Sequence, residues 1–415
     1  MAASAPATAL IVFVIVYAAM AVGHLPGLQV DRTGAALVGA LALIATGTID
    51  ARGAWNAIDY RTIGLLFGLM IVSSAFVVSG FYAWAAARVA TLPVGPQALL
   101  AVLIGTSAAL SSLLTNDVVV VAMTPLLVVA TLARGLNPVP FLLGFCFAAN
   151  TGSVATIIGS PQNMIVAQGL HLSFMGFTAV TIVPALISLL IVWTVLALLY
   201  RDRWRLAPAP ASAASGPSAS VPVNHWETTK AAVVALGVVA LFVFTEWPRE
   251  QVALGAAALL LLNRTISSTD MLKHVDGDLI LLLMGLFVVN AALAQSGLPE
   301  ALLARLHADG VDLRQPLWLF AVSSVLSNIV GNNPAVMLLV PYVADATPDA
   351  AGAALALGTG FSSNLVVFGS LAGIIVVEAA ARRGIRIPFS EFSRAGGGVA
   401  LITMAVAAAW IVSLG

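Results

Sequence analysis

The chain has 415 residues, of which 60% are hydrophobic and 9% are charged, and its mean hydropathy is +1.03. Soluble domains carry about 25% charged residues, so this composition excludes a water-soluble globular protein. The net charge of zero gives no basic surface for a nucleic-acid partner, and the single cysteine, Cys146, excludes an intrachain disulfide framework. Several apolar runs reach the roughly 20 residues that cross a lipid bilayer. The sequence predicts an all-α, multi-pass membrane protein, and its bias toward Ala, Val and Gly favours a bacterial inner (cytoplasmic) membrane.

Residues 1–200 form the first predicted repeat. This half begins with three apolar spans, continues with a hairpin at 97–133 and a broken helix at 140–168, and closes with a fourth span. The uninterrupted spans are Ala7–Gly27, Thr33–Thr48, Thr62–Gly80 and Phe174–Tyr200. Residues 201–226 begin with arginines and continue as a Pro/Ala/Ser tract. Because that composition buries little apolar surface, we expect a flexible cytoplasmic linker there.

Residues 227–415 repeat this order and form the second predicted repeat. Three apolar spans come first, and a hairpin at 315–346 and a broken helix at 350–381 follow them. The uninterrupted spans of this half are Lys230–Glu246, Gln251–Leu262, Leu279–Gly297 and Gly396–Leu414.

Residues of several types recur in the two halves at a nearly constant spacing. The hairpin sequence LSSLLTNDVVVVAMTP at Leu110–Pro125 matches LSNIVGNNPAVMLLVP at Leu326–Pro341 with an offset of 216. At an offset of 217, a second set of residues matches: Arg32 with Arg249, Asp59 with Asp276, and Gly68 with Gly285. We infer an internal duplication from these matches.

The number of membrane crossings decides how the two halves are related. If each hairpin enters and leaves on the same side, each half crosses the bilayer an odd number of times, which inverts the second half. With the linker in the cytoplasm, thirteen Lys and Arg residues lie inside and five outside, as the positive-inside rule requires. We therefore expect an inverted structural repeat with about ten transmembrane helices, two opposed re-entrant hairpins, two broken helices and both termini outside.

Polar residues interrupt both hairpins and are the first candidates for a transport site. They are Thr115, Asn116 and Asp117 in the first hairpin, and Asn332 and Asn333 in the second. Polar groups at membrane depth are costly and mark functional sites. A helix that ends there leaves free N–H groups at one broken end and free carbonyl groups at the other, and these attract anions and cations respectively.

The two broken helices carry the second set of candidates. Asn150, Ser153 and Asn163 lie in the first broken helix, and Ser363 and Asn364 lie in the second. We expect them to face the hairpin tips. A purely structural hydrogen bond is the alternative for Asn163 and Asn364.

Asp117 has no acidic counterpart, because Asn333 occupies the matching position of the second half. Three roles are open to its carboxyl group: a proton carrier, a ligand of sodium together with Asn116 and Asn332, or an N-cap of the helix that follows. No His/Cys metal cluster is present, so the sequence implies no cofactor beyond H⁺ or Na⁺ as a coupling ion.

Three other acids have simpler interpretations. We expect Asp59 and Asp276 to cap helices at span entrances, and Glu378 to pair with Arg382 four residues further on.

Four motifs resemble those of the ion transporter superfamily. T-N-D-x5-M-T-P at Thr115–Pro125, S-N-I-x-x-N-N-P at Ser327–Pro334 and G-S-L-A at Gly369–Ala372 are similar to motifs of the arsenite-efflux permeases. A-T-I-I-G-S-P-Q-N at Ala155–Asn163 looks more like the related anion permeases and, more distantly, the sodium-dicarboxylate symporters. The resemblance implies a scaffold part and a transport part, with solute held between the hairpin tips and the broken helices.

These features predict a secondary active transporter, and not an enzyme, that moves a small inorganic anion or an arsenite-like metalloid by alternating access. A sodium/proton antiporter and a sodium-coupled carboxylate symporter are the alternatives, although an acid at the hairpin tip disfavours a dicarboxylate. No GxxxxGK[ST] motif for ATP occurs in the chain. The sequence leaves open both an accessory ATPase subunit and a homodimer.

Overall fold

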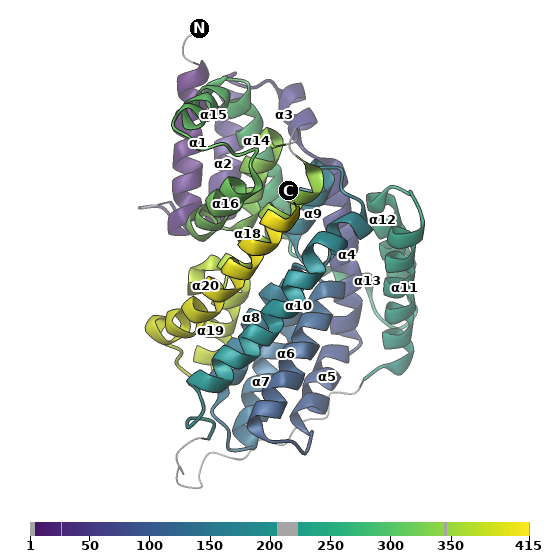
Figure 1. The fold of residues 1–415 in the computed structure, drawn as a ribbon. Coiled ribbons are helices and arrows are strands. Elements are labelled where there is room, and N and C mark those ends of the chain that lie inside the picture. The colour runs from purple at the N-terminus through teal and green to yellow at the C-terminus, as the bar shows by residue number, and fades with distance from the viewer. Residues whose placement is uncertain (1–4, 26, 206–222, 344–346, 415) are drawn as a thin grey trace.

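The computed structural model describes residues 5–25, 27–205, 223–343 and 347–414. Every named element in these residues is a helix, so the predicted all-α fold is confirmed (Figure 1). The helices of the first half are α1 (Ala5–Val22), α2 (Arg32–Ala45), α3 (Ala51–Ala57), α4 (Tyr60–Val78), α5 (Phe81–Ala90), α6 (Pro96–Leu113), α7 (Asn116–Ala133), α8 (Pro138–Ser153), α9 (Pro161–Gly169) and α10 (Phe174–Leu199).

The second half contains a similar order of helices, although α17 (Asn332–Leu339) has 8 residues where α7 has 18. They are α11 (His225–Phe244), α12 (Arg249–Leu261), α13 (Ser268–Leu272), α14 (Gly277–Ala294), α15 (Leu298–Ala308), α16 (Pro316–Val330), α17 (Asn332–Leu339), α18 (Pro348–Ser362), α19 (Leu371–Ala381) and α20 (Phe389–Leu414), with short 3₁₀ turns at Val340–Tyr342 and Val367–Gly369. This order agrees with a duplication, while the inverted relation of the halves stays a prediction.

Both predicted hairpins are pairs of helices with a short tip. In the first, α6 ends at Leu113 and α7 begins at Asn116. In the second, Gly331 alone separates α16 from α17, and its φ of +96° is a conformation that favours glycine. Figure 1 shows α6 and α7 in the lower half of the molecule and α16 in the upper half, so the hairpins extend toward its middle from different ends.

Both predicted broken helices are interrupted where the polar residues lie. α8 ends at Ser153 and α9 begins at Pro161, a residue that suits the first turn of a helix because it has no N–H to leave unpaired. α18 ends at Ser362 and α19 begins at Leu371, directly after Ser370. Each break leaves non-helical backbone inside the protein.

Eight helices of the described chain are long and apolar enough to cross a membrane: α1, α4, α6, α7, α10, α11, α14 and α20. Two predicted spans, Thr33–Thr48 and Gln251–Leu262, correspond to the shorter helices α2 and α12, which have 14 and 13 residues. At about 1.5 Å per residue these helices reach roughly 20 Å, against a hydrocarbon core of about 30 Å. Neither of them extends over the full thickness of a bilayer.

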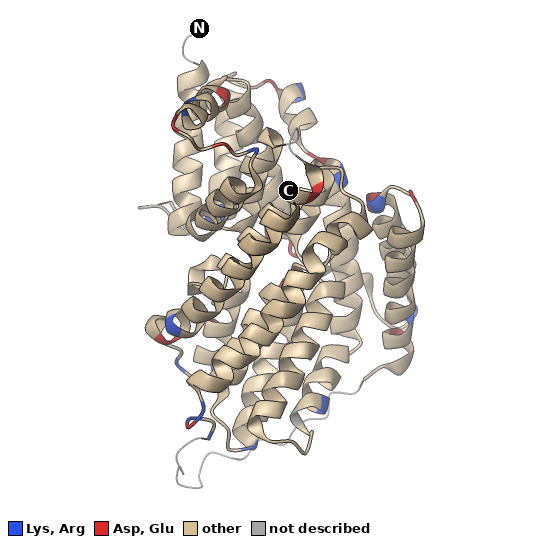
Figure 2. Ribbon diagram, in the orientation of Figure 1, with Lys and Arg blue, Asp and Glu red and all other residues tan. Residues whose placement is uncertain are grey.

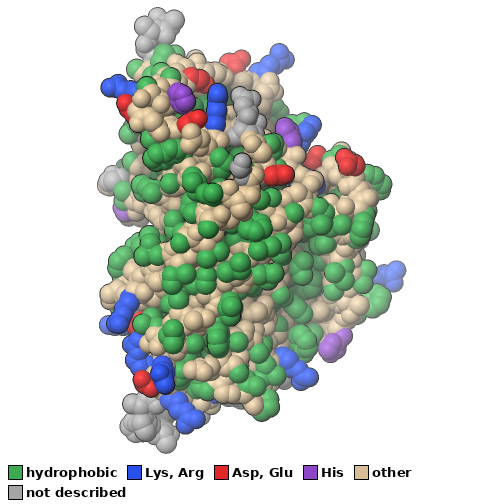
Figure 3. Space-filling model, viewed as in Figure 1, with side chains coloured by type: hydrophobic (Ala, Val, Ile, Leu, Met, Phe, Trp, Pro, Cys, Tyr) green, Lys and Arg blue, Asp and Glu red, His purple; other side chains and the backbone are tan. Residues whose placement is uncertain are grey.

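Short helices from each half pack on long helices from the other half. α2 lies against α14, and α12 lies against α4. Charged residues gather toward the two ends of the ribbon (Figure 2), and hydrophobic side chains cover the middle of the face shown in Figure 3. Such a surface suits a protein whose middle is surrounded by lipid.

The structure describes both ends of the predicted linker at 201–226. Trp204 is buried against Phe141, and its carbonyl accepts a hydrogen bond from the N–H of Asn137 at 2.9 Å. Trp226 belongs to α11, which begins at His225. Residues 206–222 lie outside the described part of the chain.

We predict that Gly68→Ala and Gly285→Ala each destabilise the protein, because these repeat-related glycines lie where helices of the two halves cross. An added Cβ would lie 2.5 Å from the carbonyl carbon of Ala253 at Gly68, and 2.8 Å from that of Ala36 at Gly285. Overpacking of this kind costs about 1–3 kcal/mol. Thermal unfolding in detergent measures the loss, and Gly105→Ala is the control because its Cβ meets nothing within 4 Å. Unchanged stability in both variants would contradict the close packing.

Candidate functional site

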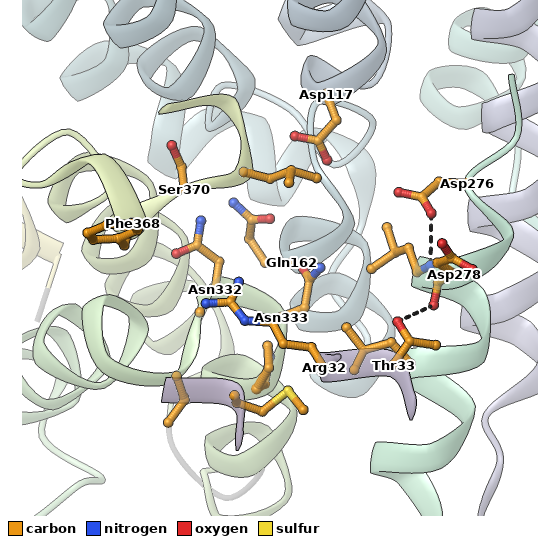
Figure 4. Close-up of a pocket in the computed structure, with 18 of the residues that line it drawn as sticks. Arg32, Thr33, Asp117, Gln162, Asp276, Asp278, Asn332, Asn333, Phe368 and Ser370 are labelled. Carbon is orange, nitrogen blue, oxygen red and sulfur yellow. Dashed lines mark hydrogen bonds between the residues drawn. The ribbon is translucent and has the colours of Figure 1, made fainter. Parts of the chain in front are cut away.

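A cavity of about 280 Å³ lies where the two hairpin tips meet (Figure 4). Its wall combines both hairpins, the second segments of both broken helices, and the starts of α2 and α14. The polar residues that line it are Arg32, Thr33, Asn116, Asp117, Gln162, Asp276, Asp278, Asn332, Asn333 and Ser370. Met20, Leu279, Leu282, Val330 and Phe368 supply apolar surface.

The first hairpin tip brings Asn116 and Asp117 to the cavity. The N–H of Asn116 donates to the carbonyl of Gly159 at 3.0 Å, which fastens the tip to the break between α8 and α9. The Asn116 side chain is only 6% exposed, and its Oδ1 has no hydrogen-bond partner. A buried amide oxygen without a partner is costly, so this atom is suited to accept a hydrogen bond from a solute.

Asp117 lies in the first turn of α7, where a negative charge is favourable beside the free N–H groups of a helix start. Thr115 is the N-cap residue of this helix, and neither it nor Asp117 is recorded as capping a backbone N–H through its side chain. Thr115 is instead held behind the cavity, where its hydroxyl and its N–H both lie within 3.2 Å of Ser73 Oγ. The N-cap interpretation of Asp117 is therefore not supported, and its carboxyl group faces the cavity.

The second hairpin tip supplies Asn332 and Asn333. The Asn332 amide donates to Ser363 Oγ at 2.9 Å, which fastens this tip to the break after α18. The Oδ1 of Asn333 has no hydrogen-bond partner. Each tip is thus tied to the broken helix of its own half and leaves an amide oxygen available.

Besides α2 and α14, which Asp31 and Asp276 cap, four helices begin at the cavity wall without a carboxylate cap: α7, α9, α17 and α19. A helix start carries roughly half a positive charge from its unpaired N–H groups. The side chain of Gln162, in the first turn of α9, also lines the wall and is 5% exposed. These starts give the cavity a positive background potential.

Three carboxyl groups and one guanidinium group share this potential. Asp117 comes from α7, Asp276 and Asp278 from the start of α14, and Arg32 from the start of α2. Asp276 caps α14 as predicted, since its Oδ1 accepts from the N–H of Leu279 at 2.9 Å, and it also lines the cavity. Thr33 ties the two helix starts together by donating to the carbonyl of Asp278 at 3.2 Å.

The remaining candidates lie behind the wall and join the two broken helices. Asn150 donates to Asn364 Oδ1 and to Ser370 Oγ, both at 3.0 Å. Asn364 in turn donates to Thr151 Oγ1 at 3.3 Å. This buried network crosses from one half of the chain to the other, so Asn150 and Asn364 hold the breaks together and do not line the cavity.

Asn163 closes the first break on itself. Its amide donates to the carbonyl groups of Ser153 and Thr156 at 2.9 and 2.8 Å. Asn163 and Ser153 are fully buried, and neither lines the cavity. Asn163 therefore makes purely structural hydrogen bonds, and Ser153 accepts one of them through its backbone carbonyl.

The simpler interpretations of the other acids hold. Asp59 accepts hydrogen bonds from the N–H groups of Arg61 and Thr62 and so caps α4. Glu378 lies 3.8 Å from Arg382, as the four-residue spacing predicts. Among the described residues, no group of three His, Cys, Asp or Glu side chains is placed to hold a metal ion.

Several cavity residues were not predicted as site residues: Arg32, Thr33, Gln162, Asp276, Asp278 and Ser370. The duplication repeats Arg32 and Asp276, but their place at the starts of apolar spans predicts a position at the membrane surface and not in a cavity. The short length of α2 is the signal that could have found Arg32, because a helix that does not span the bilayer can begin deep in the protein.

Comparison with known proteins identifies the family. The family model described as citrate transporter, CitMHS, matches residues 8–373. The chain belongs to this family. A relative from Mycobacterium leprae, named a 46 kDa membrane protein, is 29% identical over 425 residues. The match covers 97% of this chain and 97% of that protein. The family membership confirms the predicted resemblance to the ion transporter superfamily, and the protein is a multi-pass membrane transporter.

Other relatives and a solved structure have more specific names. The silicon efflux transporter of Oryza sativa is 34% identical over 163 residues, which cover 39% of this chain and 33% of that protein. A Dictyostelium discoideum transporter named arsB is 32% identical over 177 residues, covering 43% and 31% respectively. The YdaH transporter of Alcanivorax borkumensis shares the fold, with a TM-score of 0.57 and 15% identity over 98% of this chain and 97% of that one.

We predict that Asn163→Ala lowers the stability of the protein, whereas Gln162→Ala weakens solute binding. Asn163→Ala should lower the free energy of unfolding by about 1–3 kcal/mol, because two buried carbonyl groups lose their donor. Gln162→Ala removes a cavity side chain and should weaken solute binding while leaving thermal stability close to that of the wild type. Thermal unfolding and the KM of transport provide the two measurements. An equal loss of stability in both variants would contradict this division.

Proposed function

We propose that this family member is a secondary active transporter that moves a small uncharged metalloid hydroxide, such as arsenious or silicic acid, in exchange for a monovalent cation. The observation that carries the proposal is the charge balance of the cavity. Three carboxyl groups line it, together with one guanidinium group and six helix starts. Alternating access between two pseudo-equivalent halves would expose this cavity to each side in turn.

The charges at the cavity nearly cancel. The six helix starts, α2 and α14 included, contribute about half a charge each, or about three positive charges together, and Arg32 adds a fourth. The carboxylates of Asp31, which caps α2, and of Asp117, Asp276 and Asp278 offset these charges. An uncharged solute leaves that balance intact, whereas a bare tricarboxylate would add negative charge to a site of low dielectric.

The unpaired polar atoms of the cavity suit a solute with several hydroxyl groups. The amide oxygens of Asn116 and Asn333 lack partners and accept hydrogen bonds. Free N–H groups at the starts of α7 and α17 donate to hydroxyl oxygens. A metalloid hydroxide presents both donors and acceptors from a compact centre, so it can satisfy both kinds of group at once.

Two relatives support this solute class by their names. One is a silicon efflux transporter and the other is named arsB, and both match a stretch of this chain. The family description favours a second candidate, a citrate-like carboxylate. In that case cations must enter with the carboxylate, because the acids of the cavity would otherwise repel it.

Reconstitution in proteoliposomes tests the proposal. We expect arsenite and germanic acid, an analogue of silicic acid, to move when a pH or sodium gradient is imposed, and citrate to move at a small fraction of that rate. The measurement is the metalloid content of the vesicles over time, with empty liposomes as the control. Citrate uptake without metalloid movement would establish the second candidate, and sodium–proton exchange that needs no solute would replace both.

We predict that Asp117→Asn abolishes cation-coupled transport while the protein still folds. The carboxyl group is half-buried at the cavity, and the matching position in the second half already carries Asn333, so an amide fits this part of the fold. Metalloid movement driven by a pH or sodium gradient should fall to the level of empty liposomes. Coupling of wild-type strength in this variant would show that the carboxyl group carries neither the proton nor the sodium ion.

A further inference from the structure

Arg32 is the cationic side chain among the described residues that line the cavity. Its Nε has no hydrogen-bond partner. No ion pair within 4.0 Å is recorded for its guanidinium group in the described chain, although three carboxyl groups line the same cavity. A half-buried arginine without a partner is costly, and this arrangement calls for an explanation beyond packing.

Figure 4 shows the Arg32 side chain extended along the cavity, with its guanidinium group toward Asn332 and Asn333. Asp117 and Asp276 lie on another side of the same space. Asp31, the acid next to Arg32 in the chain, caps α2 instead, because its Oδ1 accepts a hydrogen bond from the N–H of Gly34 at 2.7 Å. Arg32 therefore shares the cavity with the carboxylates but forms no ion pair with any of them.

The duplication provides an internal comparison. Arg249 begins α12 as Arg32 begins α2, and it is half-buried in the same way. Arg249 donates to the backbone carbonyl of Leu172 and does not line the cavity. An arginine at this helix start can thus bond to a backbone carbonyl, even though Nη1 of Arg249 lacks a partner, whereas Arg32 at the cavity has no such bond.

We propose that Arg32 is a tethered counter-ion, a residue that determines coupling by balancing the cavity acids whenever the monovalent coupling cation is absent. This inference rests on the proposed function. When the cation has left, the guanidinium group moves to the carboxylates and offsets their charge. When the cation binds near Asp117, Arg32 returns to the second hairpin tip. Without Arg32, the cation-free cavity keeps an uncompensated negative charge inside the protein.

Arsenite exchange across proteoliposome membranes isolates the cation-free step. The assay is run at mildly alkaline pH with sodium replaced by N-methylglucamine, so that neither protons nor sodium replace Arg32 as the positive charge of the cavity. Arg32→Gln should lower the exchange rate by about tenfold or more, since a buried uncompensated charge raises the barrier. Arg32→Lys should retain most of the rate, because it keeps the charge.

The double variant Arg32→Gln/Asp117→Asn gives the decisive comparison. Removing one negative charge should make the counter-ion unnecessary and restore arsenite exchange to within about threefold of the wild type. Arg249→Gln is the matched control for loss of a half-buried arginine at a helix start, and thermal unfolding verifies that each variant is folded. A purely structural role for Arg32 would leave the double variant as slow as the single one.

The outcomes separate this inference from the proposed function. If wild-type protein moves no arsenite or germanic acid under any gradient, the proposed function fails. If wild-type protein shows coupled transport but Arg32→Gln exchanges arsenite as fast as Arg249→Gln, the counter-ion role is wrong. The same conclusion follows if the double variant gains nothing over Arg32→Gln.

Discussion

Backbone groups at the ends of interrupted helices must find partners inside the protein, and this requirement governs the rest of the structure. A lipid-exposed N–H or carbonyl group without a hydrogen bond costs several kcal/mol. The first hairpin tip meets the requirement through the bond from Asn116 N–H to the Gly159 carbonyl. In the second half, the Asn328 amide near the end of α16 donates to the Ser362 carbonyl at 3.2 Å, and the side chains of Asn332 and Ser363 hold the tip to the same break. Each interrupted element therefore needs the other, and the hairpins and broken helices form one buried assembly.

The charge of the cavity follows from this assembly. Because several helices begin at one place, their N–H groups produce a positive potential that the protein offsets with acids. Asp117, Asp276 and Asp278 supply that negative charge, and Arg32 adds a positive one. The cavity thus has no excess charge to attract a large anion, yet it carries several groups whose charge changes when a cation arrives. Such a site is suited to coupling.

The fold could be predicted from the sequence to the extent that polar residues interrupt apolar runs. A pair such as Thr115 and Asn116 inside a long apolar segment has few interpretations other than a hairpin tip, because the energetic cost is high. The sequence could not predict which of the polar candidates line the cavity and which hold the broken helices together. Asn163 and Gln162 are adjacent, but one bonds backbone carbonyls and the other lines the cavity, and this depends on how α9 is rotated. Arg32 was missed because hydropathy does not show how deep a short helix begins.

The two halves preserve the residues that shape the fold and differ in those that face the solute. Gly68 and Gly285 both lie against an alanine of the opposite half, so the duplication has kept this close contact. At the cavity the pairs diverge: Asp117 faces it where Asn333 lies opposite, and Arg32 enters it while Arg249 bonds backbone. Under the proposed alternating access, two equivalent halves would allow the cavity to open to either side with similar energy, because equivalent contacts would exchange. The asymmetric charge set would then make the binding of one ion change the charge balance by a whole unit, as the proposed coupling requires.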